Sequence, residues 1–223
     1  MQTAALTARP WTLAGLAIAL LGLPAIVTVH RLVATVPGAG GAVAIRETLI
    51  LALVALLLWI VVAREKLPLT SIGIGTAGIW RSLGWGLALA MLCVLGLAAC
   101  LGLFALIDVH YGQGSAPLSV SLWATALTTV RAGIAEEVFY RGYAIERIAA
   151  LTGSRWAAAS IPLVMFAAFH YRQGWPGIFI AFVLGAILTA FYLWKRNLVA
   201  NILAHFLVDF VPNVLLPLLA GGD

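Results

Sequence analysis

Long apolar runs dominate the hydrophobic pattern of this chain. About 20 apolar residues in an α-helix cross roughly 30 Å of hydrocarbon. Runs of about this length occur at residues 11–29, 44–63, 83–107, 118–145, 156–171 and 176–194. No segment alternates with period two over the length of a barrel strand, and membrane helices satisfy their own backbone hydrogen bonds. The pattern therefore predicts an all-α, polytopic membrane helix bundle with about six full spans.

The C-terminal tail holds two shorter apolar pieces, at residues 198–210 and 213–220. Pro212 lies between them, and a proline inside a helix removes one hydrogen bond and clashes with the preceding turn. We expect two short C-terminal helices, broken or kinked at Pro212. Because no fixed-period repeat or low-complexity tract divides the chain, we expect a single transmembrane domain over residues 1–223.

Composition agrees with this pattern. Of the 223 residues, 63% are hydrophobic and 9% are charged, whereas a soluble domain has about 25% charged residues. Membrane lipid is therefore an expected partner. The formal net charge is +5, but the basic residues are scattered through short loops, which does not indicate a nucleic-acid-binding surface. We expect no nucleic-acid partner.

The basic residues predict the orientation of the chain, because Lys and Arg are enriched in cytoplasmic loops. With the N-terminus in the cytoplasm, three arginines fall outside: Arg31, Arg46 and Arg172. More basic residues then fall inside: Arg9, Arg64, Lys66, Arg81, Arg147, Arg155, Lys195 and Arg196. A chain this short and simple is typical of bacteria. We therefore predict a protein of the bacterial cytoplasmic membrane with its N-terminus in the cytoplasm.

Two adjacent acids interrupt the fourth apolar run. A carboxylate in hydrocarbon costs several kcal/mol, so Glu136 and Glu137 indicate function. Arg141 follows Glu137 by four residues on the same helix face, which favours an ion pair. Glu136 lies about 100° around the helix and is free of that pair, so we interpret it as a working general base. In the structural alternative, Arg141 and Arg131 only neutralise the acids and hold helices together.

Two histidines extend this candidate site. His170 ends the fifth apolar run, and His205 lies four residues before Asp209, which can accept a hydrogen bond from one imidazole nitrogen and fix the other toward a cavity. At 1.5 Å per residue, the predicted topology places Glu136 and both histidines between the middle of the bilayer and its cytoplasmic half. We expect them to surround one buried cavity, with water between Glu136 and His170 as the nucleophile.

These residues lie in three motifs with a familiar order. EEVFYRG at residues 136–142 resembles an E-E-x-x-x-R signature, FAAFH at 166–170 resembles F-x-x-x-H, and HFLVD at 205–209 resembles H-x-x-x-(N/D). The three motifs in this order resemble the type II CAAX prenyl protease family, also called the CPBP or Abi intramembrane proteases. The resemblance covers a motif-bearing core at about residues 118–210.

The resemblance implies an intramembrane endopeptidase that depends on glutamate. In such an enzyme Glu136 would activate water and His170 would position it. His205, with the residue at 209, would stabilise the tetrahedral oxyanion, and Arg141 would orient Glu137. The family substrate suggests cleavage near the C-terminus of a lipidated CAAX protein. For a bacterial chain, a membrane-associated peptide or protein is the safer expectation.

Asp209 departs from the eukaryotic prenyl proteases, which carry Asn at this position. An ionised Asp cannot donate a hydrogen bond to an oxyanion, so the roles that remain are orienting His205 or binding a metal. Glu136, His170 and His205 also form a possible nitrogen and oxygen ligand set for zinc, although the chain lacks the H-E-x-x-H arrangement. No cofactor is certain, and zinc stays open.

Two other functions fit intramembrane acids and histidines. A proton-coupled transporter uses such groups as a relay, but the chain shows no inverted repeat with broken helices in corresponding halves. A non-catalytic membrane immunity or scaffold protein is the other alternative. Loss or survival of function after substitution of Glu136 and His170 separates these alternatives from the peptidase.

Overall fold

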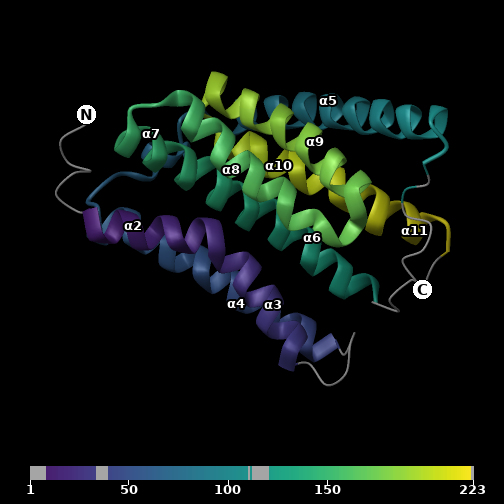
Figure 1. Ribbon diagram of the computed structural model, residues 1–223, viewed down its shortest axis with the longest axis horizontal. Coiled ribbons are helices and arrows are strands. Elements are labelled where there is room, and N and C mark those ends of the chain that lie inside the picture. The colour runs from purple at the N-terminus through teal and green to yellow at the C-terminus, as the bar shows by residue number, and fades with distance from the viewer. Residues whose placement is uncertain (1–8, 34–39, 110, 112–120, 222–223) are drawn as a thin grey trace.

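The computed structural model describes residues 9–33, 40–109, 111 and 121–221 (Figure 1). All regular secondary structure within these ranges is helical, with no strand among them, which confirms the predicted all-α class. Five helical stretches are long and apolar enough to cross a membrane: Pro10–Leu32, Gly41–Arg64, Ile79–Leu106, Arg155–Lys195 and Leu198–Leu219. These stretches agree with an integral membrane protein.

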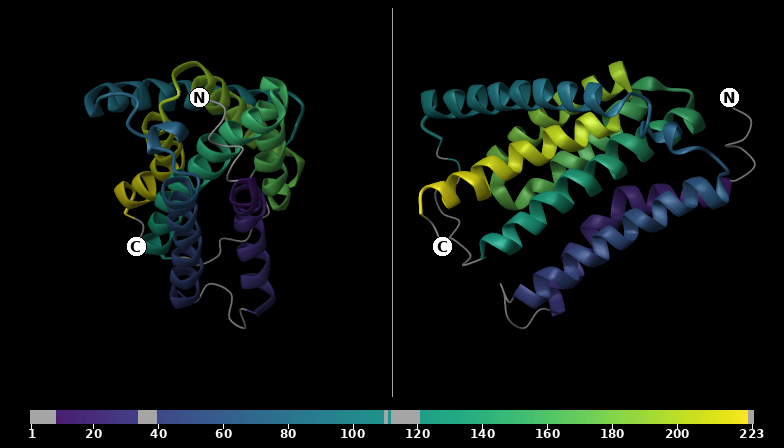
Figure 2. Two further views of the ribbon diagram at one scale, coloured as in Figure 1. Left: turned by 90° about the vertical axis from the view of Figure 1, so that its left-hand side faces the viewer. Right: turned by 180° about the vertical axis from the view of Figure 1, so that it is seen from behind.

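The first two apolar runs form a helical hairpin along one side of the molecule (Figure 2). Helix α2 (Arg9–Ala17) continues through the π turn η1 (Ile18–Gly22) into α3 (Leu23–Val33). Helix α4 (Gly40–Trp59) ends in a second π turn, η2 (Ile60–Arg64). Helix α4 packs against the central helix α6. The hairpin therefore supplies one wall of the central part of the bundle.

Helix α5 (Ile79–Leu106) lies on the opposite side of the bundle (Figure 2). It packs on α10 and α9 and follows a short 3-10 turn, η3 (Leu69–Ile72). Its outer face leaves Leu87, Met91 and Leu95 more than half exposed. Large apolar side chains repeated every four residues on an exposed face are typical of a helix that faces lipid.

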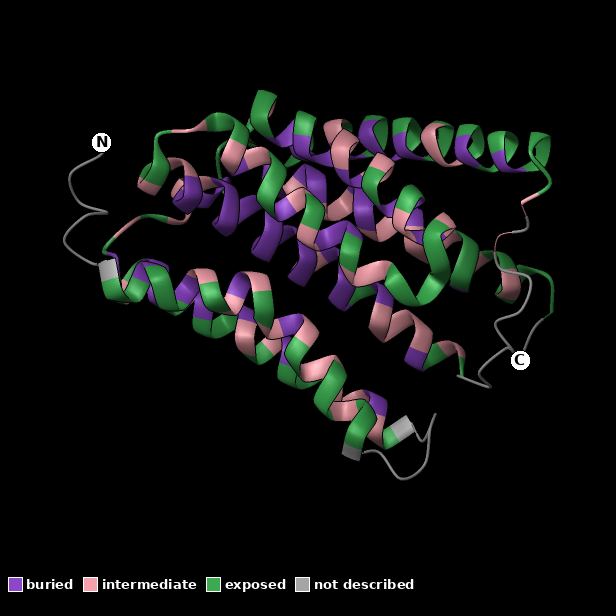
Figure 3. Ribbon diagram, in the orientation of Figure 1, coloured by how far each residue is buried: buried purple, intermediate pink, exposed green. Residues whose placement is uncertain are grey.

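The acid-bearing segment forms the central helical run, which consists of α6 (Leu122–Glu136), the π-helical segment η4 (Glu137–Ile145) and α7 (Glu146–Thr152). All residues of η4 are buried, and Figure 3 shows buried residues concentrated in this part of the bundle. The predicted fourth span began at residue 118, outside the described residues, and the helical run extends seven residues beyond its predicted end. Neighbouring helices, and not lipid, surround its charges.

The next two helices fold back on each other. Helix α8 (Arg155–Phe169) ends in a 3-10 turn, η5 (His170–Gln173), and α9 (Gly174–Lys195) returns beside it. Gly174 has a φ of +71°, a backbone conformation that favours glycine. The turn explains how one apolar stretch of 41 residues provides two helices, as predicted, and it places His170 at the tip of the hairpin.

The chain does not break at Pro212. Helix α10 (Leu198–Phe210) continues through the π turn η6 (Val211–Leu215) into α11 (Leu216–Leu219). Pro212 lies at the start of that turn, where a π bulge accommodates a residue that lacks an N–H. The predicted irregularity is therefore a local widening of the helix, and the two predicted pieces form one helical run.

A glycine allows the central helix to approach α10 closely. A Cβ at Gly133 would lie 3.0 Å from Cβ of Phe206 and 3.1 Å from the carbonyl oxygen of Ile202. Both distances are shorter than ordinary van der Waals contact, so a larger side chain would push α10 away. This approach brings His205, on the same turn of α10, to the acids of the central helix.

A buried polar cluster joins the N-terminal hairpin to the central helix. Glu65 accepts hydrogen bonds from Thr12 at 2.8 Å, from the Tyr143 hydroxyl at 2.8 Å and from Nε of Arg147 at 2.9 Å. Because all four side chains are buried, each bond also removes the cost of an unpaired polar group. The cluster lies at the end of the bundle predicted to face the cytoplasm, and that orientation stays a prediction.

Candidate active site

Glu137 is a fully enclosed acid of the site. Its side chain is 0% exposed, and its Oε1 accepts hydrogen bonds from Arg141 Nη1 and His205 Nδ1, both at 2.7 Å. Asn201 donates to Oε2 at 3.1 Å. The Glu137–Arg141 pair predicted from the four-residue spacing is present. The sequence did not predict that His205 and Asn201 also bind this carboxylate, because both come from α10, far along the chain.

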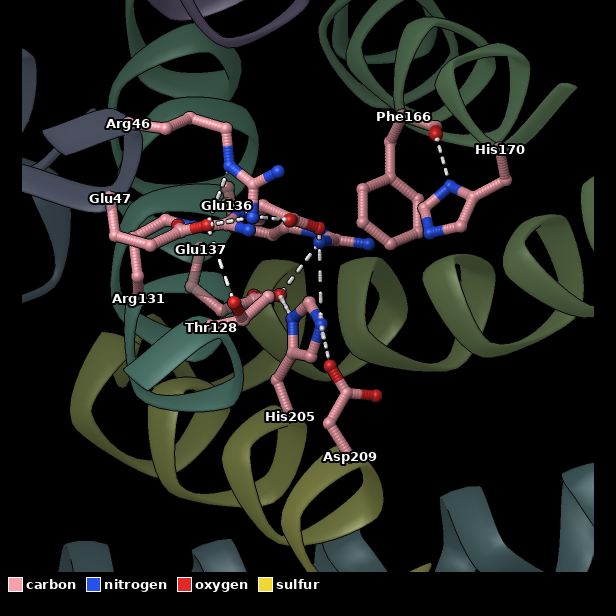
Figure 4. Close-up of polar contacts among 11 residues, drawn as sticks. Arg46, Glu47, Thr128, Arg131, Glu136, Glu137, Phe166, His170, His205 and Asp209 are labelled. Atoms are coloured by element: carbon pink, nitrogen blue, oxygen red, sulfur yellow. Dashed lines mark hydrogen bonds and ion pairs between the residues drawn. The ribbon is translucent and has the colours of Figure 1, made fainter. Parts of the chain in front are cut away.

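Glu136 is free of Arg141 but is not unpaired. Its Oε1 accepts a hydrogen bond from Arg131 Nη1 at 2.9 Å, and Nε of the same guanidinium donates to Glu47 on α4 (Figure 4). The pair with Arg131 is the one that the structural alternative expected, whereas Glu47 was not singled out from the sequence. The available signal for Glu47 was the same as for the Glu pair, an acid inside an apolar run.

Glu47 is 0% exposed and accepts hydrogen bonds from several side chains. Arg46 Nε donates to its Oε1 at 2.8 Å, and the Thr128 hydroxyl donates to the same oxygen at 3.3 Å. Together with Arg131, these contacts form a chain of alternating charges from α4 to Glu136 on α6. The contacts fix the orientation of the Glu136 carboxylate through Oε1, so Oε2 is left for other partners.

The His205 ring lies between three carboxylates. Nδ1 donates to Glu137, whereas Nε2 lies 3.5 Å from Oδ2 of Asp209 and 3.9 Å from Oε2 of Glu136 (Figure 4). The sequence predicted that Asp209 fixes the ring. In the structure the short bond to Glu137 fixes it, and Asp209 makes a longer contact with the other nitrogen. Both ring nitrogens therefore face carboxylate oxygens, which can accept hydrogen bonds from an imidazolium.

His170 reaches the same cavity from the tip of the α8–α9 hairpin. Its Nδ1 lies 2.9 Å from the carbonyl oxygen of Phe166, so this nitrogen donates, and Nε2 has no hydrogen-bond partner among the described residues. The Phe166 ring packs against both histidines, with centroid distances of 5.0 Å to His170 and 6.0 Å to His205. Arg141 lies 4.2 Å over the same ring. Phe166 thus supports all three side chains.

One cavity connects the predicted groups. It has a volume of about 370 Å³, and its polar lining includes Glu136, His170, His205 and Asp209. Glu137 and Arg141 do not line it; they lie behind His205 and support it. We call this space the catalytic cavity. The structure therefore brings together the four predicted catalytic side chains and places the two predicted orienting side chains outside the cavity.

The described residues do not fit a metal site. No group of three or more His, Cys, Asp or Glu side chains within them is arranged to hold a metal ion. In the ligand set considered above, one Glu136 oxygen is already bonded to Arg131. A guanidinium beside a carboxylate also opposes a nearby cation. We therefore derive no step through a metal.

Fold and site together define a membrane helix bundle with a cavity lined by acids and histidines. Residues 117–211 match the family described as Type II CAAX prenyl endopeptidase Rce1-like. This part of the chain is a domain of that family, which implies a peptidase and a protein substrate. No curated protein and no solved structure matches the chain. The match leaves α4, and with it Glu47, outside the family domain.

Proposed function

We propose that this protein is an intramembrane endopeptidase that hydrolyses a peptide bond of a membrane-associated, CAAX-like substrate with water activated by Glu136. One observation carries the proposal. Glu136 lines the catalytic cavity with Oε1 held by Arg131, while Oε2 lies 3.9 Å from His205 Nε2. A carboxylate fixed through one oxygen can use the other as a base.

The reaction begins with a water molecule bound to Oε2 of Glu136. The carboxylate takes a proton from this water while the water oxygen attacks the carbonyl carbon of the scissile bond. The free Nε2 of His170 orients the water. When the tetrahedral intermediate collapses, the C–N bond breaks and Glu136 returns the proton to the leaving amine. The products are a new carboxyl group and a new amine.

His205 supplies the group that stabilises the oxyanion. Its Nε2 faces the cavity, and Glu137 prevents the ring from turning because it holds Nδ1. An imidazolium N–H is a strong donor to a developing negative charge. Asp209 does not contact the oxyanion in this mechanism. Its carboxylate lies beside Nε2 and balances the positive charge of the ring.

The lining of the catalytic cavity supports an apolar substrate. Beside its polar groups, the cavity is lined by apolar side chains from α5, α9 and α10, among them Leu97, Leu184 and Val208. Such walls suit aliphatic residues or a lipid group next to the scissile bond. A membrane-associated peptide with aliphatic residues near its end fits this surface.

The test uses purified protein in phosphatidylcholine vesicles and a fluorescein-labelled peptide ending in S-farnesyl-Cys-Val-Leu-Ser. Glu136→Gln keeps an acceptor for Arg131 but removes the base, so kcat should fall by about 10²–10⁴-fold. Glu146→Gln is the matched control, because Glu146 lies on the same helical run and pairs with the half-exposed Arg196. Mass spectrometry of the products locates the cleaved bond.

Two outcomes would contradict this function. Equal cleavage by wild type and Glu136→Gln would remove Glu136 from the reaction. If the double substitution Glu136→Ala and His170→Ala left the cellular phenotype of the protein intact, a non-catalytic immunity or scaffold role would replace the peptidase.

A further inference from the structure

A second cavity adjoins the catalytic cavity and is strongly basic. It has a volume of about 330 Å³. Four arginines from four different elements line it: Arg31 of α3, Arg46 of α4, Arg131 of α6 and Arg172 of η5. His170 and Gln173 line both cavities, so the two spaces meet at the tip of the α8–α9 hairpin. We call this second space the basic cavity.

The positive charge of the basic cavity is only partly neutralised. Arg46 and Arg131 pair with Glu47, and Arg131 also pairs with Glu136. Within the described residues, neither Arg31 nor Arg172 has a carboxylate within ion-pair distance.

Arg31 also lies near other positive charges. Arg31 lies close enough to Arg172 and Arg46 for like-charge repulsion. Guanidinium groups that outnumber the neighbouring acids can bind an anion, above all a planar carboxylate, with two hydrogen bonds each.

We propose that the basic cavity binds the C-terminal carboxylate of the peptide substrate and so places the scissile bond a few residues from the chain end. This proposal rests on the proposed peptidase function. Arg131 links the two spaces, because it donates to Glu136 and also lines the basic cavity. A substrate that passes His170 and Gln173 has its reacting carbonyl in the catalytic cavity and its terminal carboxylate in the basic cavity.

The basic cavity begins beside Glu136, because Arg131 donates to Glu136 and also lines that cavity. An extended chain advances about 3.3–3.6 Å per residue, so three residues span about 10 Å. Arg46 is connected to Glu136 through Glu47 and Arg131 alone, by direct ion pairs. Arg31 and Arg172 are exposed, so an incoming carboxylate can reach them. Because His170 lines both cavities, the basic cavity adjoins the catalytic cavity. This position favours a substrate carboxylate over a lipid phosphate as the occupant.

Binding to Glu136→Gln measures recognition without hydrolysis. The probes are two fluorescein-labelled peptides of the same sequence ending in S-farnesyl-Cys-Val-Leu-Ser, one with a free C-terminal carboxylate and one with a C-terminal amide. In phosphatidylcholine vesicles, the carboxylate peptide should bind about tenfold or more tightly than the amide. Adding Arg31→Gln and Arg172→Gln should abolish this preference.

Two further variants test whether charge is the cause. Lysine at both positions should restore part of the preference, because it keeps the charge but not the two-pronged geometry. Arg155→Gln removes an exposed arginine from the opposite end of α8 and should leave the preference unchanged. In the otherwise native enzyme, the double Gln variant should raise KM for the carboxylate peptide and leave kcat nearly constant.

Three results would overturn the proposal: equal affinity for the two peptides, equal loss of affinity for both in the double Gln variant, or tight binding of phosphatidylglycerol with no discrimination between the peptides. The last result would assign the basic cavity to a lipid headgroup. Because binding is measured in Glu136→Gln, a preference for the carboxylate would stand even if the wild type hydrolysed neither peptide. Failure of the basic cavity is thus distinguishable from failure of the peptidase.

Discussion

Replacing Arg141 with leucine should destabilise the protein more than any surface substitution. The Arg141 side chain is 1% exposed and that of Glu137 is 0% exposed, and their charged atoms lie 2.7 Å apart. Arg141 also donates to the carbonyl oxygen of Gly185 at 3.2 Å. Leucine fills much of the volume but leaves the Glu137 carboxylate buried without its cation.

The magnitude follows from the burial of the pair. Unit charges about 4 Å apart attract by about 4 kcal/mol at an effective dielectric constant of about 20. Removal of one partner from a buried pair costs about 3–5 kcal/mol in proteins. The two estimates agree, so Arg141→Leu should lower the free energy of unfolding by about 3–5 kcal/mol. His205 and Asn201 still donate to Glu137, which places the expected value near the lower end.

The assay is equilibrium unfolding in detergent micelles, with Arg196→Leu as the matched control. Arg196 pairs with Glu146 at 2.9 Å, but its side chain is 48% exposed, so this substitution should cost only about 0–1 kcal/mol. Adding Glu137→Gln to Arg141→Leu should recover part of the loss, since the neutral amide needs no cation. If Arg141→Leu cost no more than Arg196→Leu, the assignment of Glu137 as a buried, charge-dependent support would be refuted.

Two further predictions concern residues that the sequence did not single out. Glu47→Gln should lower kcat about tenfold to a hundredfold, because Glu136 loses part of the support that orients it; an unchanged kcat would remove Glu47 from the positioning of the site. Tyr140→Phe should leave the melting temperature equal or higher, since the buried Tyr140 hydroxyl has no hydrogen-bond partner among the described residues. Tyr143→Phe should lower it, because that hydroxyl donates to Glu65 at 2.8 Å, and the reverse order in a thermal scan would contradict both assignments.

Local patterns in the sequence were sufficient to predict the helices and some of the side-chain contacts within a helix. The length of the apolar runs predicts membrane helices, because a buried backbone in lipid must satisfy its own hydrogen bonds. The four-residue spacing of Glu137 and Arg141 predicts their ion pair, and the same spacing places Asp209 beside His205. Such contacts depend only on helix geometry, which the chain defines within one or two turns.

Contacts between distant segments needed the tertiary structure. Arg131 and Glu47 are 84 residues apart, and His205 and Glu137 are 68 residues apart. The π-helical form of residues 137–145 and the continuous helix through Pro212 also emerged only there.

The physical reason is that helices in lipid are apolar on nearly all faces. Their hydrophobic pattern therefore says little about which face meets which neighbour. Close approaches such as the one at Gly133 set the rotation of each helix. Those rotations decide which acid pairs with which arginine. The sequence by itself determined which charged groups enter the membrane, and the packing of the helices decided how these groups pair around the two cavities.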